Sequence, residues 1–176
     1  MSAAAPRRVL GIDPGTRVTG WGVVETTGNR MRLVACGALR LDDEEIAARL
    51  LAIREGLRGV VAEHAPSAVA LERPFLGKNP HSALTVGMAR GVAMLAAADA
   101  GLEVREYSPA VVKKAVVGNG NASKHQVAQM VRVILGLPSA PEPADATDAL
   151  AVALAEAHRA GLRGPLARLG AVESGT

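Results

Sequence analysis

The stretch VLGIDPGT, residues 9–16, decides the fold because it joins an apolar run to a sharp turn. The apolar run predicts a buried strand over residues 8–13, and Pro14-Gly15 turns the chain at its end. Asp13 closes the strand, so its carboxylate is expected at one edge of the sheet. An aspartate in this place either serves a functional site or only caps the turn.

The residues that follow predict an antiparallel meander. Two further strands, over residues 19–26 and 30–40, are separated by Gly28-Asn29, a residue pair suited to a tight hairpin turn. The connections between these strands are short. With the strand that ends at Asp13, they form a predicted three-stranded meander at the start of the chain.

The rest of the chain alternates helices and strands. Apolar residues at steps of three and four from Ile46 to Val60 predict an amphipathic helix over 42–65, which Pro66 ends. An apolar run over 67–72 follows, and a strand in this place favours a parallel crossover connection to the first strand. The further predicted elements are a helix over 82–100, a strand over 102–107, a helix capped by Ser108 with Pro109 in first position, a helix over 123–135 and a helix over 144–160.

These elements fit one α/β domain over residues 1–176, with 1–6 and about 162–176 expected to be flexible tails. We predict a five-stranded mixed sheet, made of the antiparallel three-stranded meander plus parallel strands and flanked by helices. A hydrophobic content of 49% supports a sizeable core. Cys36 is the single cysteine, and neither a secretory signal nor a membrane span is visible, so we expect a cytoplasmic protein that does not enter a membrane.

Three more acids stand, like Asp13, at the edges of apolar runs. Glu72 ends the 67–72 strand, and Asp145 and Asp148 begin the last helix in the sequence ADATDALA. Adjacent parallel strands place Asp13 and Glu72 at the same end of the sheet. Converging carboxylates repel one another unless a cation lies between them. We therefore expect two divalent cations with all-oxygen ligands, which is the layout of a metal-dependent phosphodiester nuclease.

Each of these acids also has a structural alternative. A glutamate at the end of a strand is usually only solvated, and a carboxylate in the first turn of a helix favours its positive end. Asp145 and Asp148 are three residues apart, so they share one face of that turn. One cap explains one aspartate, and a shared ligand explains the second better because neighbouring anions raise each other's pKa.

Basic residues outside the predicted strands indicate a nucleic-acid surface. The net charge is only +3, but drawing four acids into one site leaves the remaining surface more basic than that total. The alternative is an ordinary solvated face. The residues concerned are Arg17, Arg73, Lys78, Arg90, Lys113, Lys114, Lys124 and Arg132.

The loop RPFLGKN, residues 73–79, combines basic residues with the one phenylalanine of the chain. An exposed Phe75 could stack on nucleic-acid bases, whereas a buried Phe75 would fill the core. The residues of the loop leave both interpretations open.

Taken together, these motifs closely resemble the RuvC family of bacterial Holliday junction resolvases, within the ribonuclease-H-like superfamily. The resemblance runs from about Arg8 to about Ala160. The motifs that carry it are GIDPGTRVTGWGVV from residue 11, LERPFLGKNPHSALTVGMARG from residue 71, VVGNGNASKHQV from residue 116 and DATDALAVA from residue 145. The chain departs from the family in its extra amino-terminal stretch through Pro6, and it has aspartate at position 148, where some members carry histidine.

The resemblance implies a role for each candidate residue. The implied catalytic and metal-binding acids are Asp13, Glu72, Asp145 and Asp148. Lys113 and Lys124 would lie near the scissile phosphate, where they either stabilise the transition state or only position the DNA. Phe75 would touch bases at the junction centre. From their charge, the other expected DNA contacts are Arg73, Lys78, Arg90 and Lys114.

The resemblance also implies cofactor and partners. The family works as a homodimer with RuvA and RuvB at four-way DNA junctions, so we expect the same partners here. We expect Mg²⁺ as the cofactor, two ions per subunit, with Mn²⁺ as a substitute. Two symmetric nicks would leave 5′-phosphate and 3′-hydroxyl ends that a ligase can seal, as homologous recombination and DNA repair require.

Other functions share part of this pattern. A ribonuclease-H-like nuclease acting on RNA has the same first strand, but the Phe75 loop and the DATDALA helix favour the junction enzyme. An actin-like ATPase or sugar kinase needs a second phosphate loop of Asp-Gly-Gly type, which the sequence lacks. A catalytically silent junction-binding protein would not need four acids. We therefore expect an endonuclease that resolves Holliday junctions.

Overall fold

The computed structural model describes residues 5–73 and 80–166. Its strands are β1 Arg7–Asp13, β2 Val18–Thr27, β3 Arg30–Arg40, β4 Ala68–Glu72 and β5 Glu103–Tyr107. Its helices are α1 Ile46–His64, α2 Pro80–Asp99, α3 Pro109–Val117, α4 Lys124–Ile134 and α5 Ala144–Leu166. The predicted α/β class and the predicted order of elements are confirmed.

The strands form one mixed sheet in the order β3-β2-β1-β4-β5. β1 pairs antiparallel with β2 and β2 antiparallel with β3, whereas β4 runs parallel to β1 and β5 parallel to β4. The predicted meander plus parallel strands is therefore confirmed. Ile12 of β1 lies opposite Leu71 of β4, so the next residues, Asp13 and Glu72, end their strands at the same edge.

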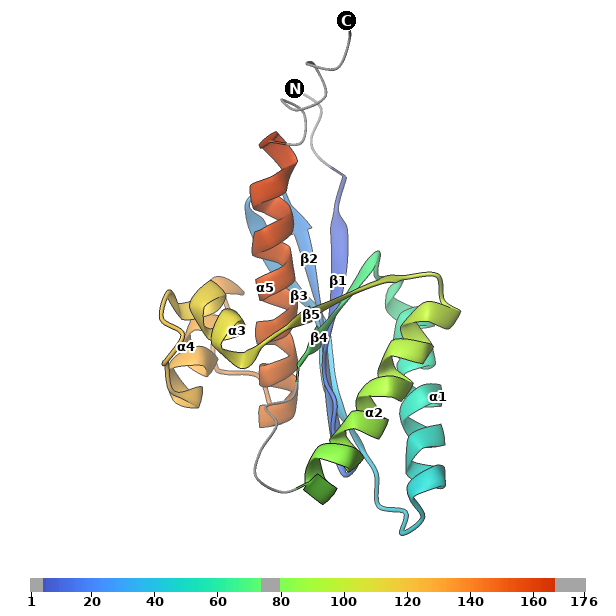
Figure 1. Ribbon diagram of the computed structural model, residues 1–176. Helices are drawn as coiled ribbons and strands as arrows, with labels where there is room; N and C mark the ends of the chain where they lie inside the picture. The colour runs from blue at the N-terminus through green and yellow to red at the C-terminus, as the bar shows by residue number, and fades with distance from the viewer. Residues whose placement is uncertain (1–4, 74–79, 167–176) are drawn as a thin grey trace, which may run out of the picture.

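Helices cover both faces of the sheet (Figure 1). α3, α4 and α5 lie on one face, and α1 and α2 lie on the other. Alternate residues of β1 serve the two faces, because side chains of a strand point to opposite sides. Val9 joins the core beneath α5, while Leu10 and Ile12 join the core beneath α1 and α2.

Helix α5 approaches β1 and β2 at glycines. A side chain at Gly11 would meet the backbone oxygen of Ala149 at 2.0 Å, and one at Gly20 would meet the backbone oxygen of Asp145 at 2.0 Å. Any other residue would push the helix away. Because Gly20 is the strand partner of Asp13, the close approach also brings the start of α5 to that carboxylate.

The first long helix begins later than predicted. α1 starts at Ile46 instead of residue 42, because the Asp43 side chain accepts a hydrogen bond of 3.0 Å from the backbone N–H of Glu45 and holds a local turn. The end of the helix agrees with the prediction. Ser108 stands at the N-cap of α3 and Pro109 follows it, as predicted.

The last helix ends later than predicted. α5 continues to Leu166, so residues 162–166 are helical, whereas we expected a flexible tail from about 162. A glycine such as Gly161 costs a helix only about 1 kcal/mol, which the long buried run before it can offset. The other parts of the expected tails, 1–4 and 167–176, lie outside the described residues. Among the residues described, none of the helices is both long enough and apolar enough to span a membrane.

Candidate active site

Three of the predicted acids line one cavity at the carboxyl ends of β1 and β4. Asp13 ends β1, Glu72 ends β4 and Asp148 lies near the start of α5. Lys113 of α3 and Lys124, the first residue of α4, line the same cavity, whose volume is about 350 Å³. Five separate elements thus bring carboxylates and cations to one place. The other lining residues are Arg73, Pro109, Val112, Val127 and Ala151.

The alternation along β1 explains why Asp13 belongs to this cavity. Val9 and Gly11 face α5, and Asp13 is the next residue of that series. The pattern of small and apolar residues in β1 therefore sends the one carboxylate of the strand to the side on which α3, α4 and α5 lie.

The two carboxylates at the strand ends destabilise each other's charged form. Burial, repulsion from Asp13 and a hydrogen bond with Asp13 raise the pKa of Glu72 to about 8. Burial also raises the pKa of Asp13, which the hydrogen bond with Glu72 opposes and repulsion from Asp148 and Asp145 reinforces. Both pKa shifts therefore disfavour two negative charges side by side at this edge of the sheet.

Lys124 supplies the cation nearest to Asp148. Its Nζ donates a hydrogen bond of 2.8 Å to Asp148 Oδ2, and this contact raises the pKa of the lysine. A capping box fixes the backbone at the start of the helix, where the lysine is the first residue. Ser123 Oγ accepts from the backbone N–H of Gln126 at 3.2 Å, and Gln126 Oε1 accepts from the backbone N–H of Ser123 at 2.8 Å. The start of α4 is thus a defined position beside the carboxylates.

Asp145 is close to the other acids without lining the cavity. Its backbone oxygen packs on Gly20, and its charge raises the pKa of Asp13. The predicted position at the start of α5 is confirmed. Three of the four predicted acids therefore line the cavity and Asp145 lies near them, while their role in holding metal ions stays a prediction. Within residues 5–73 and 80–166, no three acids, histidines or cysteines are arranged to hold a metal ion.

The chemistry of the donor set still fits a divalent cation. Asp13, Glu72 and Asp148 offer only carboxylate oxygens, which are the ligands that Mg²⁺ prefers in proteins. Burial and mutual repulsion disfavour the charged forms of the first two. A divalent cation between them would favour both charged forms.

The remaining predicted DNA contacts lie in different places. Arg73 lines the cavity, while Arg90 of α2 forms an ion pair with Glu106 of β5, whose carboxylate is also 3.9 Å from Arg73. Lys114 is exposed on α3 and does not line the cavity. Two predicted contacts, Phe75 and Lys78, lie outside the described residues.

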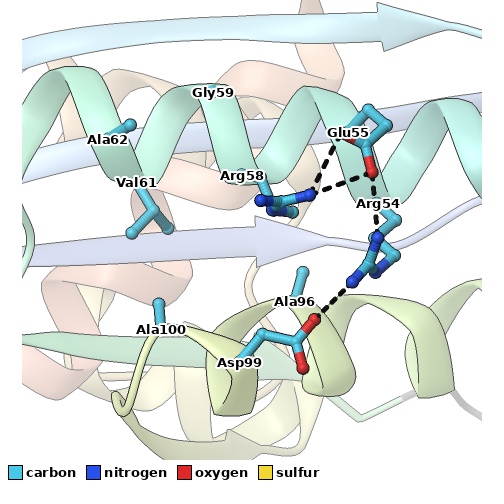
Figure 2. Close-up of a pocket in the computed structure, with 9 residues that line it drawn as sticks. All are labelled: Arg54, Glu55, Arg58, Gly59, Val61, Ala62, Ala96, Asp99 and Ala100. Atoms are coloured by element: carbon cyan, nitrogen blue, oxygen red, sulfur yellow. Dashed lines mark hydrogen bonds and ion pairs between the residues drawn. The ribbon is translucent and has the colours of Figure 1, made fainter.

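A larger cavity lies on the opposite face of the sheet, between α1 and α2 (Figure 2). Its volume is about 710 Å³, and Arg54 on its rim contacts Glu55 at 3.0 Å and Asp99 at 2.8 Å. These charges are already paired with one another. The structure describes all six predicted catalytic residues, and none of them lines this cavity. The smaller cavity is therefore the candidate active site.

Two features of the structure were not predicted from the sequence. The first is the pair of close approaches at Gly11 and Gly20, for which glycines inside predicted strands were the available signal. The second is a buried cluster around Glu156, which lies further along α5. A glutamate inside the apolar run ALAVALAEA was the signal there, since a buried charge needs partners.

A mixed sheet of this order, with acids at the ends of β1 and β4 and a third on the helix packed against them, defines a ribonuclease-H-like nuclease fold. A family model described as crossover junction endodeoxyribonuclease RuvC matches residues 9–156. The chain belongs to the RuvC family.

Relatives carry the same description. Crossover junction endodeoxyribonuclease RuvC of Rhodopseudomonas palustris strain TIE-1 is 50% identical over 173 residues, which cover 97% of this chain and 98% of the relative. The RuvC of Syntrophotalea carbinolica is 55% identical over 152 residues, 86% of this chain and 94% of the relative.

Solved structures agree. T. thermophilus RuvC in complex with a Holliday junction substrate has a TM-score of 0.84 and 40% identity, and the match covers 89% of this chain and 96% of that chain. The yeast mitochondrial Holliday junction resolvase Ydc2 has a TM-score of 0.65 at 14% identity, over 89% of this chain and 80% of the other. The second match shows a shared fold alone.

Proposed function

We propose that the protein is a metal-dependent endonuclease that resolves Holliday junctions in recombination and repair. The observation that carries this proposal is the convergence of Asp13, Glu72 and Asp148 with Lys113 and Lys124 around one cavity. Family membership and the likeness to T. thermophilus RuvC, solved with a Holliday junction substrate, support the substrate class.

The side chains in and beside the cavity have separate roles. The acids Asp13, Glu72, Asp145 and Asp148 would hold two Mg²⁺ ions per subunit, with Mn²⁺ as a substitute. When bound, the cations supply positive charge that favours ionisation of water and stabilises the leaving oxygen. Lys113 and Lys124 bind the scissile phosphate and stabilise the charge that develops on it. Attack by water in line with the 3′ oxygen leaves 5′-phosphate and 3′-hydroxyl ends.

The substrate requires a dimer. A four-way junction offers two equivalent strands, and a two-fold dimer with one cavity per subunit nicks both at matching positions. Helix α2 supports this assembly with a line of exposed apolar residues, Leu84, Met88 and Leu95, that are 60%, 39% and 52% exposed. We further propose RuvA and RuvB as partners and the cytoplasm as the location, on the strength of family membership.

The test of this function compares three substrates. A labelled four-way junction, a linear duplex and an RNA hairpin are incubated with the protein in Mg²⁺ and in EDTA, and the cuts are mapped. We expect two symmetric nicks in the junction with Mg²⁺ and none with EDTA. Cutting that favours the RNA hairpin would instead support a ribonuclease-H-like nuclease acting on RNA.

Phe75 provides a test of junction selectivity. A base stacked on an aromatic ring is worth about 1 to 3 kcal/mol, so Phe75→Ala should slow cutting of an intact junction by about tenfold. A junction already nicked near the crossover should be cut at nearly the normal rate, because its bases are already open. Single-turnover rates on both substrates, together with the melting temperature, make the comparison. Equal losses on both substrates with a large fall in melting temperature would place Phe75 in the core.

A further inference from the structure

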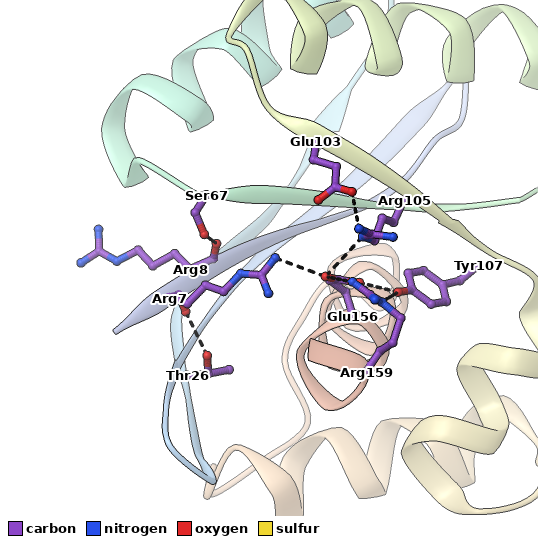
Figure 3. Close-up of polar contacts among 9 residues, drawn as sticks. All are labelled: Arg7, Arg8, Thr26, Ser67, Glu103, Arg105, Tyr107, Glu156 and Arg159. Atoms are coloured by element: carbon purple, nitrogen blue, oxygen red, sulfur yellow. Dashed lines mark hydrogen bonds and ion pairs between the residues drawn. The ribbon is translucent and has the colours of Figure 1, made fainter. Parts of the chain in front are cut away.

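Helix α5 carries a third carboxylate, Glu156, which is fully buried about two turns after Asp148. Arg159 donates hydrogen bonds to both of its oxygens, each at 2.8 Å, and Arg7 donates one at 3.3 Å. The Tyr107 hydroxyl donates to Glu156 Oε2. Figure 3 shows these side chains converging on Glu156 from β1, β5 and α5 itself.

Tyr107 joins this buried cluster to the active site. It is the last residue of β5, and its partner in the β4–β5 register is Glu72. Its backbone oxygen accepts a hydrogen bond of 2.8 Å from the backbone N–H of Arg73. Helix α3, which carries Lys113, begins two residues later at Pro109. The position of Tyr107 therefore bears directly on the elements that hold Glu72 and Lys113.

The hydroxyl of Tyr107 ties these elements to α5. Besides donating to Glu156, it accepts a hydrogen bond of 3.0 Å from Arg159 Nε. Glu156 and Arg159 both belong to α5, so the hydrogen bonds of this triangle of Tyr107, Glu156 and Arg159 connect α5 to β5 through the one hydroxyl. The other β5 contact with Glu156, from Arg105 Nε, is longer at 3.9 Å.

The charge states strengthen the link. Burial and the hydrogen bond to Glu156 raise the pKa of Tyr107 to about 12, so the phenol keeps its proton and donates. Burial acts to raise the pKa of Glu156, but the hydrogen bonds from Arg159 and Tyr107 outweigh it and lower the pKa. The bond therefore joins a phenol to an ionised carboxylate, which is a strong type of hydrogen bond.

We propose that Tyr107 is a positioning residue for cleavage: its hydroxyl fixes α5, and with it Asp148, relative to the strand end that carries Glu72. This inference rests on the proposed function. A displacement of about 1 Å at reacting groups can cost on the order of a hundredfold in rate, so losing one of several contacts to α5 should have a smaller but measurable effect.

The experiment uses Tyr107→Phe, which removes only the hydroxyl, and Arg159→Lys, which keeps the charge but loses the fork that reaches both partners. The control is Ile53→Val, a small loss of buried volume in the core on the opposite face of the sheet. Single-turnover cleavage of a four-way junction, junction affinity in EDTA, melting temperature and amide exchange are measured for each protein and for the double variants.

We expect Tyr107→Phe to cut about tenfold more slowly with junction affinity within about twofold of normal. Amides at the start of α5 should exchange faster than in Ile53→Val at an equal fall in melting temperature. Combined with Arg159→Lys, Tyr107→Phe should add little further loss, because both act through the same triangle, whereas its effect should add to that of Ile53→Val.

Two results would overturn the proposal. A Tyr107→Phe protein that cuts within twofold of the normal rate, while its melting temperature falls as in Ile53→Val, would make Tyr107 purely structural. Full additivity with Arg159→Lys would show that the two residues act separately. A wild-type protein that cuts no junction is a different failure, because it overturns the proposed function and this inference together.

Discussion

The active-site cavity and the Glu156 cluster treat negative charge in opposite ways. In the cavity, Asp13 and Glu72 meet each other, and burial and repulsion raise the pKa of Glu72 to about 8. In the cluster, Glu156 meets Arg7, Arg159 and the Tyr107 hydroxyl, and its pKa is lowered. Side chains of the protein therefore stabilise the charge of Glu156, whereas the charges of the cavity acids need a bound ligand to stabilise them.

This difference indicates separate roles for Glu156 and for the cavity acids. A carboxylate that the protein neutralises well contributes to stability and offers little to a substrate. Carboxylates that repel one another cost stability in the free protein and bind a cation more strongly for that reason. Asp148 and Glu156 belong to the same helix, so α5 carries a carboxylate of each kind.

The largest expected effect follows from removing a cavity acid. Glu72→Gln should reduce junction cleavage by at least about a thousandfold and leave junction binding largely intact, because affinity comes mainly from phosphate contacts elsewhere. Single-turnover cleavage and a binding titration in EDTA measure the two quantities. Full cleavage by the variant would rule out the cavity as the active site.

Glu72→Gln also tests how far the cavity acids lower the stability of the folded protein. The raised pKa of Glu72 means that wild-type stability without divalent cation falls as pH rises from about 4.5 towards 8, where the folded protein gives up its proton. Glu72→Gln lacks this loss, so its melting temperature in EDTA should exceed that of the wild type increasingly from pH 5 to pH 9. A variant that melts lower than wild type at pH 9 would contradict the comparison.

The Glu156 cluster should respond in the opposite direction. Glu156→Gln removes a fully buried carboxylate from two partly exposed arginines, so urea unfolding at pH 7 should show a loss of about 3 kcal/mol. The matched control is Glu103→Gln, which removes an exposed partner of Arg105 and should cost less than about 1 kcal/mol.

The acid dependence of the cluster gives an independent check. Because the pKa of Glu156 is lowered from its ordinary 4.5, its contribution is complete above that value and is lost as pH falls through the lowered pKa. The stability gap between wild type and Glu156→Gln should therefore close in acid. A gap that persists undiminished at pH 2 would show that the variant acts through packing instead of charge.

Much of the fold and the positions of three cavity acids could be predicted from the sequence. The strands that end at Asp13 and Glu72 are short apolar runs bounded by turn residues, and the helix between them predicted the parallel pairing that places the acids at one edge. The helix face of Asp148 followed from its place at the start of an apolar run. Local patterns of this kind carry their own period and boundary signals.

The parts that were not predicted depend on contacts between distant segments. A glycine in a strand indicates a close approach without naming its partner, so the packing of Asp145 on Gly20 could not be derived. The late start of α1 depends on one side-chain hydrogen bond from Asp43 to the backbone. The Tyr107–Glu156 bond joins residues 49 positions apart, and no local pattern specifies such a pair.

A smaller effect on cleavage than that of Glu72→Gln is expected from a cation in the cavity. Lys124 holds Asp148 at 2.8 Å, yet its side chain is 84% exposed, so it can exchange the carboxylate for a phosphate that enters the cavity at little cost. An ammonium held by a capped helix start at this position would stabilise charge that grows during cleavage, and losing one such donor costs about a hundredfold in rate. Lys124→Ala should therefore slow single-turnover cleavage about a hundredfold, with junction affinity within about threefold.

Lys114→Ala is the matched control, since this exposed lysine lies on α3 away from the cavity lining and should weaken binding slightly without changing the cleavage rate. A fall in affinity alone for Lys124→Ala would mean that the lysine only positions DNA and that the charge developing on the phosphate is stabilised by other groups of the cavity.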